Sequence, residues 1–205
     1  MRPIWLTLIP VLLADQALKV WIKLNCRIGD RIELVDGLIE LQFIENEGMA
    51  FGWALPGASG KLVLSLFRVL AAVAISFYVQ KLVREGAAKG LVRSVTLIWA
   101  GAVGNILDSL AYGVLFSKSG WHAPAVFLPA DGGYAGLFMG HVVDMFHFTT
   151  RWPTWFPIDA WQGREIFPPI WNFADAAIFI GVAWILIRQR SYFGGEAVET
   201  SSAGN

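Results

Sequence analysis

Four long apolar segments constrain this chain of 205 residues more than any other feature. They cover residues 4–24, 62–83, 91–116 and 171–187. Each is close to the roughly 20 residues that a helix needs to cross a hydrocarbon layer about 30 Å thick. Backbone groups find no water to bond within that layer, so a helix is the default conformation. The sequence therefore predicts an all-α membrane protein with four transmembrane helices.

The charge composition agrees with this prediction and excludes some functions. Charged residues make up 16% of the chain, against about 25% in a typical soluble domain. Lys and Arg together balance Asp and Glu at 16 each, so no basic surface for nucleic acid is predicted. The single cysteine can form neither an intrachain disulfide nor a Cys-based metal site. Ten Trp residues suit the two membrane–water interfaces.

Basic residues in the short loops predict the orientation. They lie between the second and third segments and after the fourth: Lys81, Arg84, Lys89, Arg93, Arg188 and Arg190. We therefore place both termini in the cytoplasm, and residues 28–55 and 117–170 outside. Asp15 and Lys19, not a small-residue cleavage site, follow the first apolar run, so the first segment is predicted to be retained. Residues 194–205 are predicted to be a disordered cytoplasmic tail.

The outer segments add a small amount of β-structure to the prediction. Residues 31–44 alternate apolar and polar side chains around Asp36-Gly37, a favoured two-residue turn, and so predict a β-hairpin. We expect this hairpin to lie within an outer segment of about residues 28–55. Residues 117–170 are rich in Gly, Pro and Trp, and predict a long irregular outer loop with short helices that could act as a lid. Residues 1–193 are interpreted as a single membrane-embedded domain.

Polar residues inside the apolar segments are costly and point to function. Asp15 and Lys19 share one face of the first segment; Gly101, Asn105, Asp108 and Tyr112 form a stripe on the third; Asn172 and Asp175 open the fourth. At 1.5 Å per residue, all of these positions fall in the outer half of the bilayer, a level that Asp144 can also reach. Structural roles are the alternative: burial favours pairing of Asp15 and Lys19 with each other or with loop backbone, and Asn105 and Asp108 can hydrogen-bond across helices.

The segment His141-Val142-Val143-Asp144-Met145-Phe146-His147 contains three potential metal ligands. A helix spreads them over about 120°, and a strand points Asp144 away from the two histidines. Neither conformation gathers them, so we predict no metal site. The Gly-x-Ser-x-Gly motif of serine hydrolases and the two glycine-rich nucleotide-binding motifs are absent.

The polar blocks, taken in order, resemble those of the lipoprotein signal peptidases (signal peptidase II). They are Asp15-Gln16-Ala17-Leu18-Lys19, Asn46-Glu47-Gly48-Met49-Ala50-Phe51-Gly52, Gly101-Ala102-Val103-Gly104-Asn105-Ile106-Leu107-Asp108, and the pair Val142-Val143-Asp144-Met145 with Asn172-Phe173-Ala174-Asp175. The resemblance covers about residues 4–188. It implies that the predicted hairpin belongs to an outer β-cradle over about residues 28–55, which helps to hold the substrate. It implies a bacterial inner-membrane endopeptidase, expected to be a monomer, with its active site at the outer face. Such an enzyme cleaves prolipoproteins before a diacylglyceryl-modified cysteine and uses no metal or cofactor.

The resemblance also implies roles for individual residues. Asp144 and Asp175 match the catalytic aspartates, while supporting or substrate-contacting positions are matched by Asp15, Lys19, Asn46, Gly48, Asn105, Asp108 and Asn172. The chain departs from the family pattern at Ser109, where Arg is usual, so Asp108 needs a charged partner from elsewhere. Trp171 and Met145 each replace a usual Phe, and the outer loops are longer than in compact members.

Two close carboxylates in a site of low dielectric constant can share a proton and activate water for peptide hydrolysis. Two other functions are compatible with intramembrane Asp, Lys and Asn residues. A small transporter is one, although the polar groups cluster at one level and no inverted repeat is visible. A structural subunit held together by buried polar groups is the other. Replacing Asp144 or Asp175 by Asn distinguishes them, because only a peptidase would then accumulate uncleaved prolipoprotein.

Overall fold

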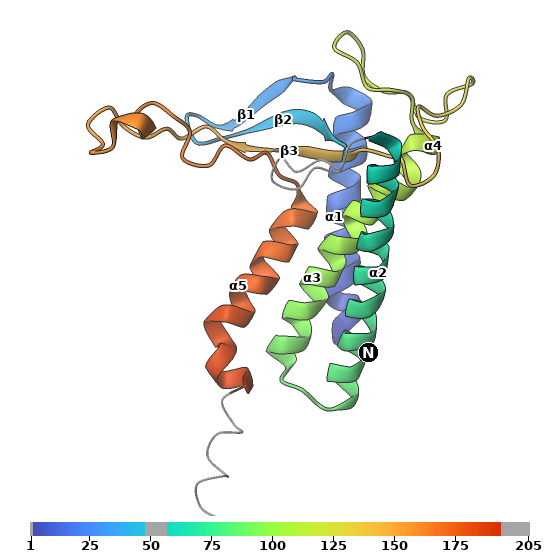
Figure 1. The fold of residues 1–205 in the computed structure, drawn as a ribbon, viewed down its shortest axis with the longest axis vertical. Helices are drawn as coiled ribbons and strands as arrows, with labels where there is room; N and C mark the ends of the chain where they lie inside the picture. Colours follow the sequence, from blue (N-terminus) through green and yellow to red (C-terminus); the bar gives the residue numbers. More distant parts are fainter. Residues whose placement is uncertain (1, 48–56, 194–205) are drawn as a thin grey trace, which may run out of the picture. The chain divides into compact units, whose positions relative to one another are not determined.

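The computed structural model describes residues 2–47 and 57–193 (Figure 1). The helices are α1 (Arg2–Asn25), α2 (Gly57–Arg84), α3 (Lys89–Leu107), α4 (Gly113–Leu115) and α5 (Phe173–Phe193). The strands are β1 (Arg31–Val35), β2 (Ile39–Asn46) and β3 (Val142–Phe148). A π-helical turn, Asp108–Tyr112, joins α3 to α4, and a short 3-10 helix covers Asp159–Trp161. The segment predicted as a cytoplasmic tail lies outside the described residues.

Within residues 2–47 and 57–193, three helical segments are long and apolar enough to cross a membrane: Ile4–Asn25, Ser59–Arg84 and Lys89–Leu115. They confirm the first three predicted spans. The fourth predicted segment forms a helix, α5, which begins at Phe173. Its apolar run is short, because Arg188 and Arg190 follow Ile187 within the same helix. That α5 crosses the membrane therefore stays a prediction.

The chain divides into two compact units; α1, α2 and α3 contribute to both, and α5 belongs to the first alone. The first unit holds Met1–Ala14, Val69–Gly104 and Phe173–Asn205. The second holds Asp15–Arg68 and Asn105–Asn172. The prediction of a single domain over residues 1–193 stays a prediction.

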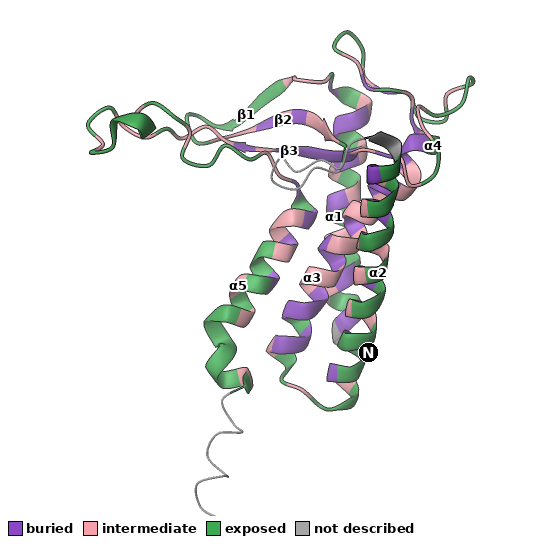
Figure 2. Cartoon of the chain, in the orientation of Figure 1, coloured by how far each residue is buried: buried purple, intermediate pink, exposed green. Residues whose placement is uncertain are grey.

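The first unit is a set of helices with a small apolar core. Its buried members are Ile4, Val79, Leu82, Leu91, Val92 and Val95. Helix α5 packs closely against α3, because a Cβ on Gly101 would collide with the carbonyl oxygen of Ala174. Gly101 therefore allows the two helices to approach closely. Figure 2 shows that much of the helical surface is exposed, and it carries large apolar side chains such as Phe77, which suit a lipid environment.

The second unit is built on a three-stranded antiparallel sheet in the order β1-β2-β3. The predicted hairpin is confirmed: Ile32 pairs with Leu41, and Val35 pairs with Ile39 beyond the turn. Strand β2 extends to Asn46, two residues further than predicted. A third strand gives the hairpin the support that an isolated two-stranded ribbon lacks.

The third strand corrects the prediction that residues 117–170 are irregular. Strand β3 occupies Val142–Phe148, in the middle of that loop, and pairs with β2. Four consecutive residues, from Val142 to Met145, are buried. A strand covered on both faces has no need for alternating polar and apolar residues, so its sequence lacks the period-two signal.

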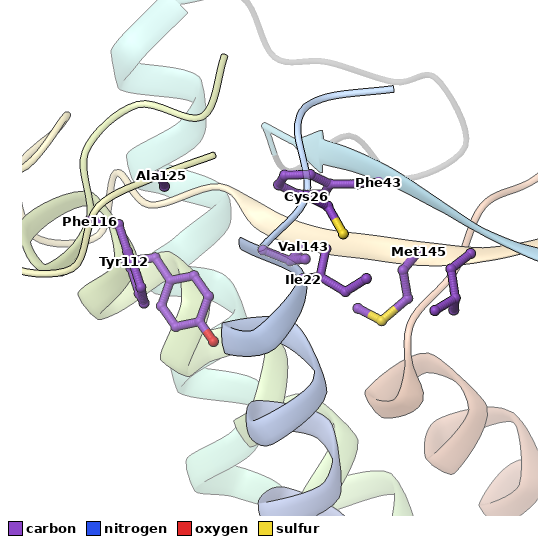
Figure 3. Close-up of a cluster of buried hydrophobic side chains, with 9 residues drawn as sticks. Ile22, Cys26, Phe43, Tyr112, Phe116, Ala125, Val143 and Met145 are labelled. Carbon is purple, nitrogen blue, oxygen red and sulfur yellow. The ribbon is translucent and has the colours of Figure 1, made fainter. Parts of the chain in front are cut away.

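An apolar cluster joins the C-terminal end of α1 to the sheet and to the loop after α4 (Figure 3). Its buried members are Ile22, Cys26, Leu41, Phe43, Tyr112, Phe116, Ala125, Val143 and Met145. The rings of Tyr112 and Phe116 meet edge to face, with centroids 4.9 Å apart. Because the cluster draws on α1, β2, β3 and the π-helical turn, it fixes their polar residues relative to one another.

Candidate active site

A buried lysine organises the polar residues of the second unit. The Nζ atom of Lys19 lies 2.8 Å from Asp108 Oδ2 and 3.0 Å from Asp15 Oδ2. It also donates a hydrogen bond of 2.9 Å to Asn105 Oδ1. Both carboxylates and the lysine are almost fully buried. The predicted Asp15–Lys19 pair is confirmed, and Asn105 and Asp108 meet it at the lysine, whereas the common depth in the bilayer stays a prediction.

Asp108 obtains from Lys19 the charged partner that Ser109 cannot supply. Gln16 Nε2 donates to Asp108 Oδ1 over 2.9 Å, and the backbone N–H of Val143 donates to Oδ2 over 3.2 Å. The Asp108 carboxylate therefore connects α1, the π-helical turn and β3. Each of its oxygens has a donor, as a buried carboxylate requires.

Gln16 is a member of this network that the sequence analysis did not single out. Its Oε1 atom accepts a hydrogen bond of 3.1 Å from the hydroxyl of Tyr112, and its Nε2 also lies 3.0 Å from Asp15 Oδ2. Its position next to Asp15 on α1 was the available signal. A π-helical turn often marks a functional site, and here it carries both Asp108 and Tyr112.

Asp144 lies on β3, and only 3% of it is exposed. Asn172 Nδ2 donates to Asp144 Oδ1 over 2.7 Å, and Asn46 Nδ2 donates to Oδ2 over 3.2 Å. Two residues predicted to support the site therefore hold one oxygen each of the predicted catalytic carboxylate.

A shared acceptor links the lysine network to Asp144. Asn105 Oδ1 accepts hydrogen bonds from Lys19 Nζ and, over 3.1 Å, from Asn172 Nδ2. Two donors at the same oxygen fix the orientation of the Asn105 amide, since its NH2 group could accept neither bond. The position of Asn172, and with it the bond to Asp144, thus depends on Lys19 through Asn105.

The backbone before Asn172 is paired with β3, which explains why this side chain reaches Asp144. The carbonyl oxygen of Trp171 accepts from the N–H groups of Met145 and Phe146, over 3.1 and 2.7 Å, and Trp171 N donates to Phe146 O over 3.0 Å. The Trp171 ring packs on Phe146, with centroids 4.8 Å apart. Trp171, a departure from the family pattern, therefore lies at the edge of the site.

Asp175 and Gly48 are the two other residues predicted for the site. Asp175 is half-buried in the first turn of α5 and belongs to the first unit. A carboxylate there is stabilised by the helix dipole. Its pairing with Asp144 stays a prediction. Gly48, like the rest of the block from Gly48 to Gly52, lies outside the described residues.

The two histidines of the predicted His-Asp-His segment have acidic partners from β2 and from the loop after β3. His147 lies between Glu40 and Glu165, with its ring nitrogens 3.0 and 3.2 Å from their carboxylate oxygens. His141 Nδ1 lies 3.2 Å from Glu45 Oε2. The strand geometry, rather than the helical one, applies. Within residues 2–47 and 57–193, no group of three or more His, Cys, Asp and Glu side chains could hold a metal ion.

A second buried network surrounds Lys23, one helical turn further along α1 than Lys19. Lys23 pairs with Glu45 and lies 3.0 Å from Ser119 Oγ. Its Nζ also sits over the ring of Tyr134, 5.0 Å from the centroid. Burial alone would raise the pKa of Glu45, but the bond to His141, the charge of Lys23 and the hydroxyl of Ser119 lower it to about 2.

Comparisons with known proteins agree with one another. The family described as "Signal peptidase (SPase) II" matches residues 7–190. A "Lipoprotein signal peptidase" of Porphyromonas gingivalis is 40% identical over 86% of this chain and 78% of its own length. One of Amoebophilus asiaticus is 32% identical over 86% of this chain and 73% of its own length.

A solved structure described as "Bacterial membrane enzyme structure by the in meso method at 2.3 A resolution" has a similar fold. Its TM-score is 0.60 at 21% identity, over 91% of this chain and 86% of that one. A second, obtained by the same method at 1.9 Å, gives a TM-score of 0.58 at 22% identity, over 90% of each chain.

Proposed function

Because the chain belongs to the signal peptidase II family, we propose that it is the aspartic endopeptidase that removes signal peptides from bacterial prolipoproteins. Membership of the family makes it a protease of the bacterial inner membrane, and its apolar helices agree with that location. The proposed cut lies just before a diacylglyceryl-modified cysteine, and the proposed reactive groups are the carboxylates of Asp144 and Asp175.

The observation that carries the proposal is the bond from Asn172 to Asp144. Asp175 follows Asn172 by three residues, so their Cα atoms are at most about 11 Å apart along the chain. A side chain three residues from a direct partner of Asp144 can reach the same substrate bond. The bond from Asn172 thus gives a physical reason why two aspartates 31 positions apart in the sequence could act together.

Two carboxylates at close range repel when both are charged, so such a pair holds one proton near neutral pH. In the proposed reaction, the ionised carboxylate removes a proton from water while the protonated one hydrogen-bonds to the scissile carbonyl oxygen. Water attacks the carbonyl carbon, a tetrahedral intermediate forms, and a proton passes to the leaving nitrogen. The roles belong to the pair, and neither aspartate is assigned alone as the base.

The buried networks support this chemistry by positioning. The two amides at Asp144 hold its carboxylate without adding charge, and Lys19 sets the Asn172 amide through Asn105. Preorganised donors of this kind act strongly where water is excluded. Asp15, Asp108 and Gln16 keep Lys19 in place, so we assign them positioning roles.

The orientation follows from the basic loops. We propose that α5 is the fourth span, that both termini are cytoplasmic, and that the sheet and Asp144 lie at the outer face. The acyl chains of the substrate could then remain in the bilayer while the scissile bond reaches the polar layer. We propose a monomer that requires no metal or cofactor.

The decisive experiment uses Asp144→Asn and Asp175→Asn. Each variant is purified in detergent and incubated with a diacylglyceryl-modified prolipoprotein, and cleavage is followed by electrophoresis. Both should lose cleavage by at least about 1,000-fold, because neither retains an ionisable pair. Asp131→Asn, an exposed acid in the outer loop, is the matched control and should cleave normally. Normal cleavage by either dyad variant, with thermal unfolding unchanged, would refute the proposal.

A further inference from the structure

The loop between β3 and α5 forms a closed arm covering residues 151–165, which we call the aromatic arm. Arg151 pairs with Glu165 as an isolated antiparallel bridge. Trp152 N donates to Arg164 O, and Gly163 N donates to Trp152 O, both over 2.9 Å. The arm therefore has a backbone-paired base, which gives it a defined conformation in place of the irregular loop predicted from its sequence.

His147 links this base to the sheet, and an arginine on each side extends the row of charges. Glu165 lies 3.2 Å from both His147 Nε2 and Arg151. On the other side of the imidazole, Glu40 lies 3.0 Å from Nδ1 and also pairs with Arg31 over 3.1 Å. A row of five charged or ionisable side chains therefore extends from β1 across β2 and β3 to the arm: Arg31, Glu40, His147, Glu165 and Arg151.

The tip of the arm presents large apolar side chains to the surroundings. Trp155 is 79% exposed, and Trp161 and Ile158 are 46% and 45% exposed. Trp161 also belongs to a cluster of rings with Trp152 and Phe156, and its ring stacks on that of Phe156 at an angle of 6°. An internal aromatic cluster holds the tip rigid, so the exposed side chains cannot simply fold inward. Exposed apolar patches of this kind mark interaction surfaces.

The position of the arm within the second unit points to lipid as its partner. The candidate span Ile4–Asn25 ends six residues before β1 begins, and Trp21 near its end is 46% exposed, as expected of a headgroup-level anchor. The sheet runs across the end of α1 rather than continuing along its axis, and the arm extends from the far end of the sheet (Figure 1). The arm therefore extends to the side of α1, at the level of the membrane–water interface.

We propose that the aromatic arm is a second membrane contact, in which Trp155, Ile158 and Trp161 insert into the headgroup region of the outer leaflet. Indole rings prefer this region because it accommodates an apolar ring and a polar N–H together. Arg164, exposed on the same arm, can meet lipid phosphates. The anchored arm would hold the sheet flat over the bilayer, beside the place where a lipid-modified peptide arrives. The proposal is independent of the peptidase chemistry.

The test measures the depth of the tip in a membrane. In a Cys26→Ala background, which removes the single native thiol, Trp155→Cys is labelled with an environment-sensitive fluorophore. The full chain is then reconstituted in vesicles of phosphatidylethanolamine and phosphatidylglycerol. Lipids that carry a nitroxide at the headgroup or deep in the acyl chain report contact with the bilayer, and iodide reports contact with water. Glu33→Cys, at an exposed acidic position on β1, is the control.

We expect the label at residue 155 to be quenched by headgroup nitroxides at least about twofold more than the label at residue 33, and to be shielded from iodide. A label at residue 155 that iodide reaches freely would overturn the proposal. So would a label shielded from iodide but not quenched by either lipid, because it would then be packed against protein. If Trp155→Cys does not fold, Ile158→Cys provides the same measurement. Peptidase activity is not the readout, so failure here leaves the proposed function untouched.

Discussion

Lys19 on α1 and Asp108 in the π-helical turn form a buried ion pair, with Nζ 2.8 Å from Oδ2, although 89 positions separate them in the sequence. Asp15 gives the same lysine a second carboxylate at 3.0 Å. The positive charge of Lys19 thus interacts with the negative charges of both Asp15 and Asp108 in a buried site. The stability of this arrangement depends on every member being present.

Replacing Lys19 by Met should destabilise the protein strongly. The change leaves two buried carboxylates without a cation, and breaking a buried pair typically costs about 3–5 kcal/mol. Thermal unfolding in detergent measures the effect. Lys118→Met, at an exposed position of the outer loop, should change the free energy of unfolding by less than about 0.5 kcal/mol. Equal stability of the two variants would show that the ion pair has little energetic importance.

Asn105 and Asn172 should be coupled in catalysis. Asn172→Ala removes the donor to Asp144, and Asn105→Ala removes the acceptor that orients it, so each should lower kcat by about 100-fold through misplacement of the carboxylate. The double variant should lose little more than either single one, because both changes interrupt one path. Asn25→Ala, exposed on α1, should keep its kcat. Fully additive losses would argue that the two amides act separately.

Gly140 should not tolerate a methyl group. A Cβ at this position would collide with the carbonyl oxygen of Asp108 and would lie 3.0 Å from the N–H nitrogen of Gly113. Gly140→Ala should therefore shift the π-helical turn, reduce cleavage and lower the midpoint of thermal unfolding. Gly136→Ala is a matched control, because a Cβ there meets nothing within 4 Å. If both variants behave like the unmodified protein, the close approach at Gly140 is not required.

Glu45 should make stability depend on acid pH. Its pKa is lowered in the folded protein from 4.5 to about 2, so the stabilisation is fully present above about pH 5 and is lost as the pH falls toward 2. The shift corresponds to about 3 kcal/mol. Unfolding midpoints measured between these pH values should fall for the unmodified protein and change less for Glu45→Gln. Glu33→Gln, an exposed substitution, should retain the original profile.

Local patterns in the sequence predicted the features that depend on local geometry. Alternating side chains around Asp36-Gly37 identified the hairpin, and the four-residue spacing of Asp15 and Lys19 identified their pair. These inferences need only the regular geometry of one helix or strand.

Features that depend on pairing between distant segments were missed or left open. Nothing local distinguishes Lys23 from an ordinary basic residue at a helix end, or Glu45 from the other outer acids, yet they form a buried pair. Strand β3 has no alternation because both of its faces are covered. Asp108 was seen to need a cation, but Lys19 had already been assigned to Asp15, and a lysine can serve two carboxylates at once.

Because the backbone of Trp171 pairs with β3, residues 172–175 act as a spacer of fixed length between the sheet and the first acid of α5. Residue 172 is set by the sheet, and the first turn of α5 starts one residue later. Inserting a single residue between 172 and 175 would rotate the carboxylate of residue 175 by about 100° around the helix axis. The number of residues in this stretch, more than their identity, therefore determines the direction in which α5 presents its first acid.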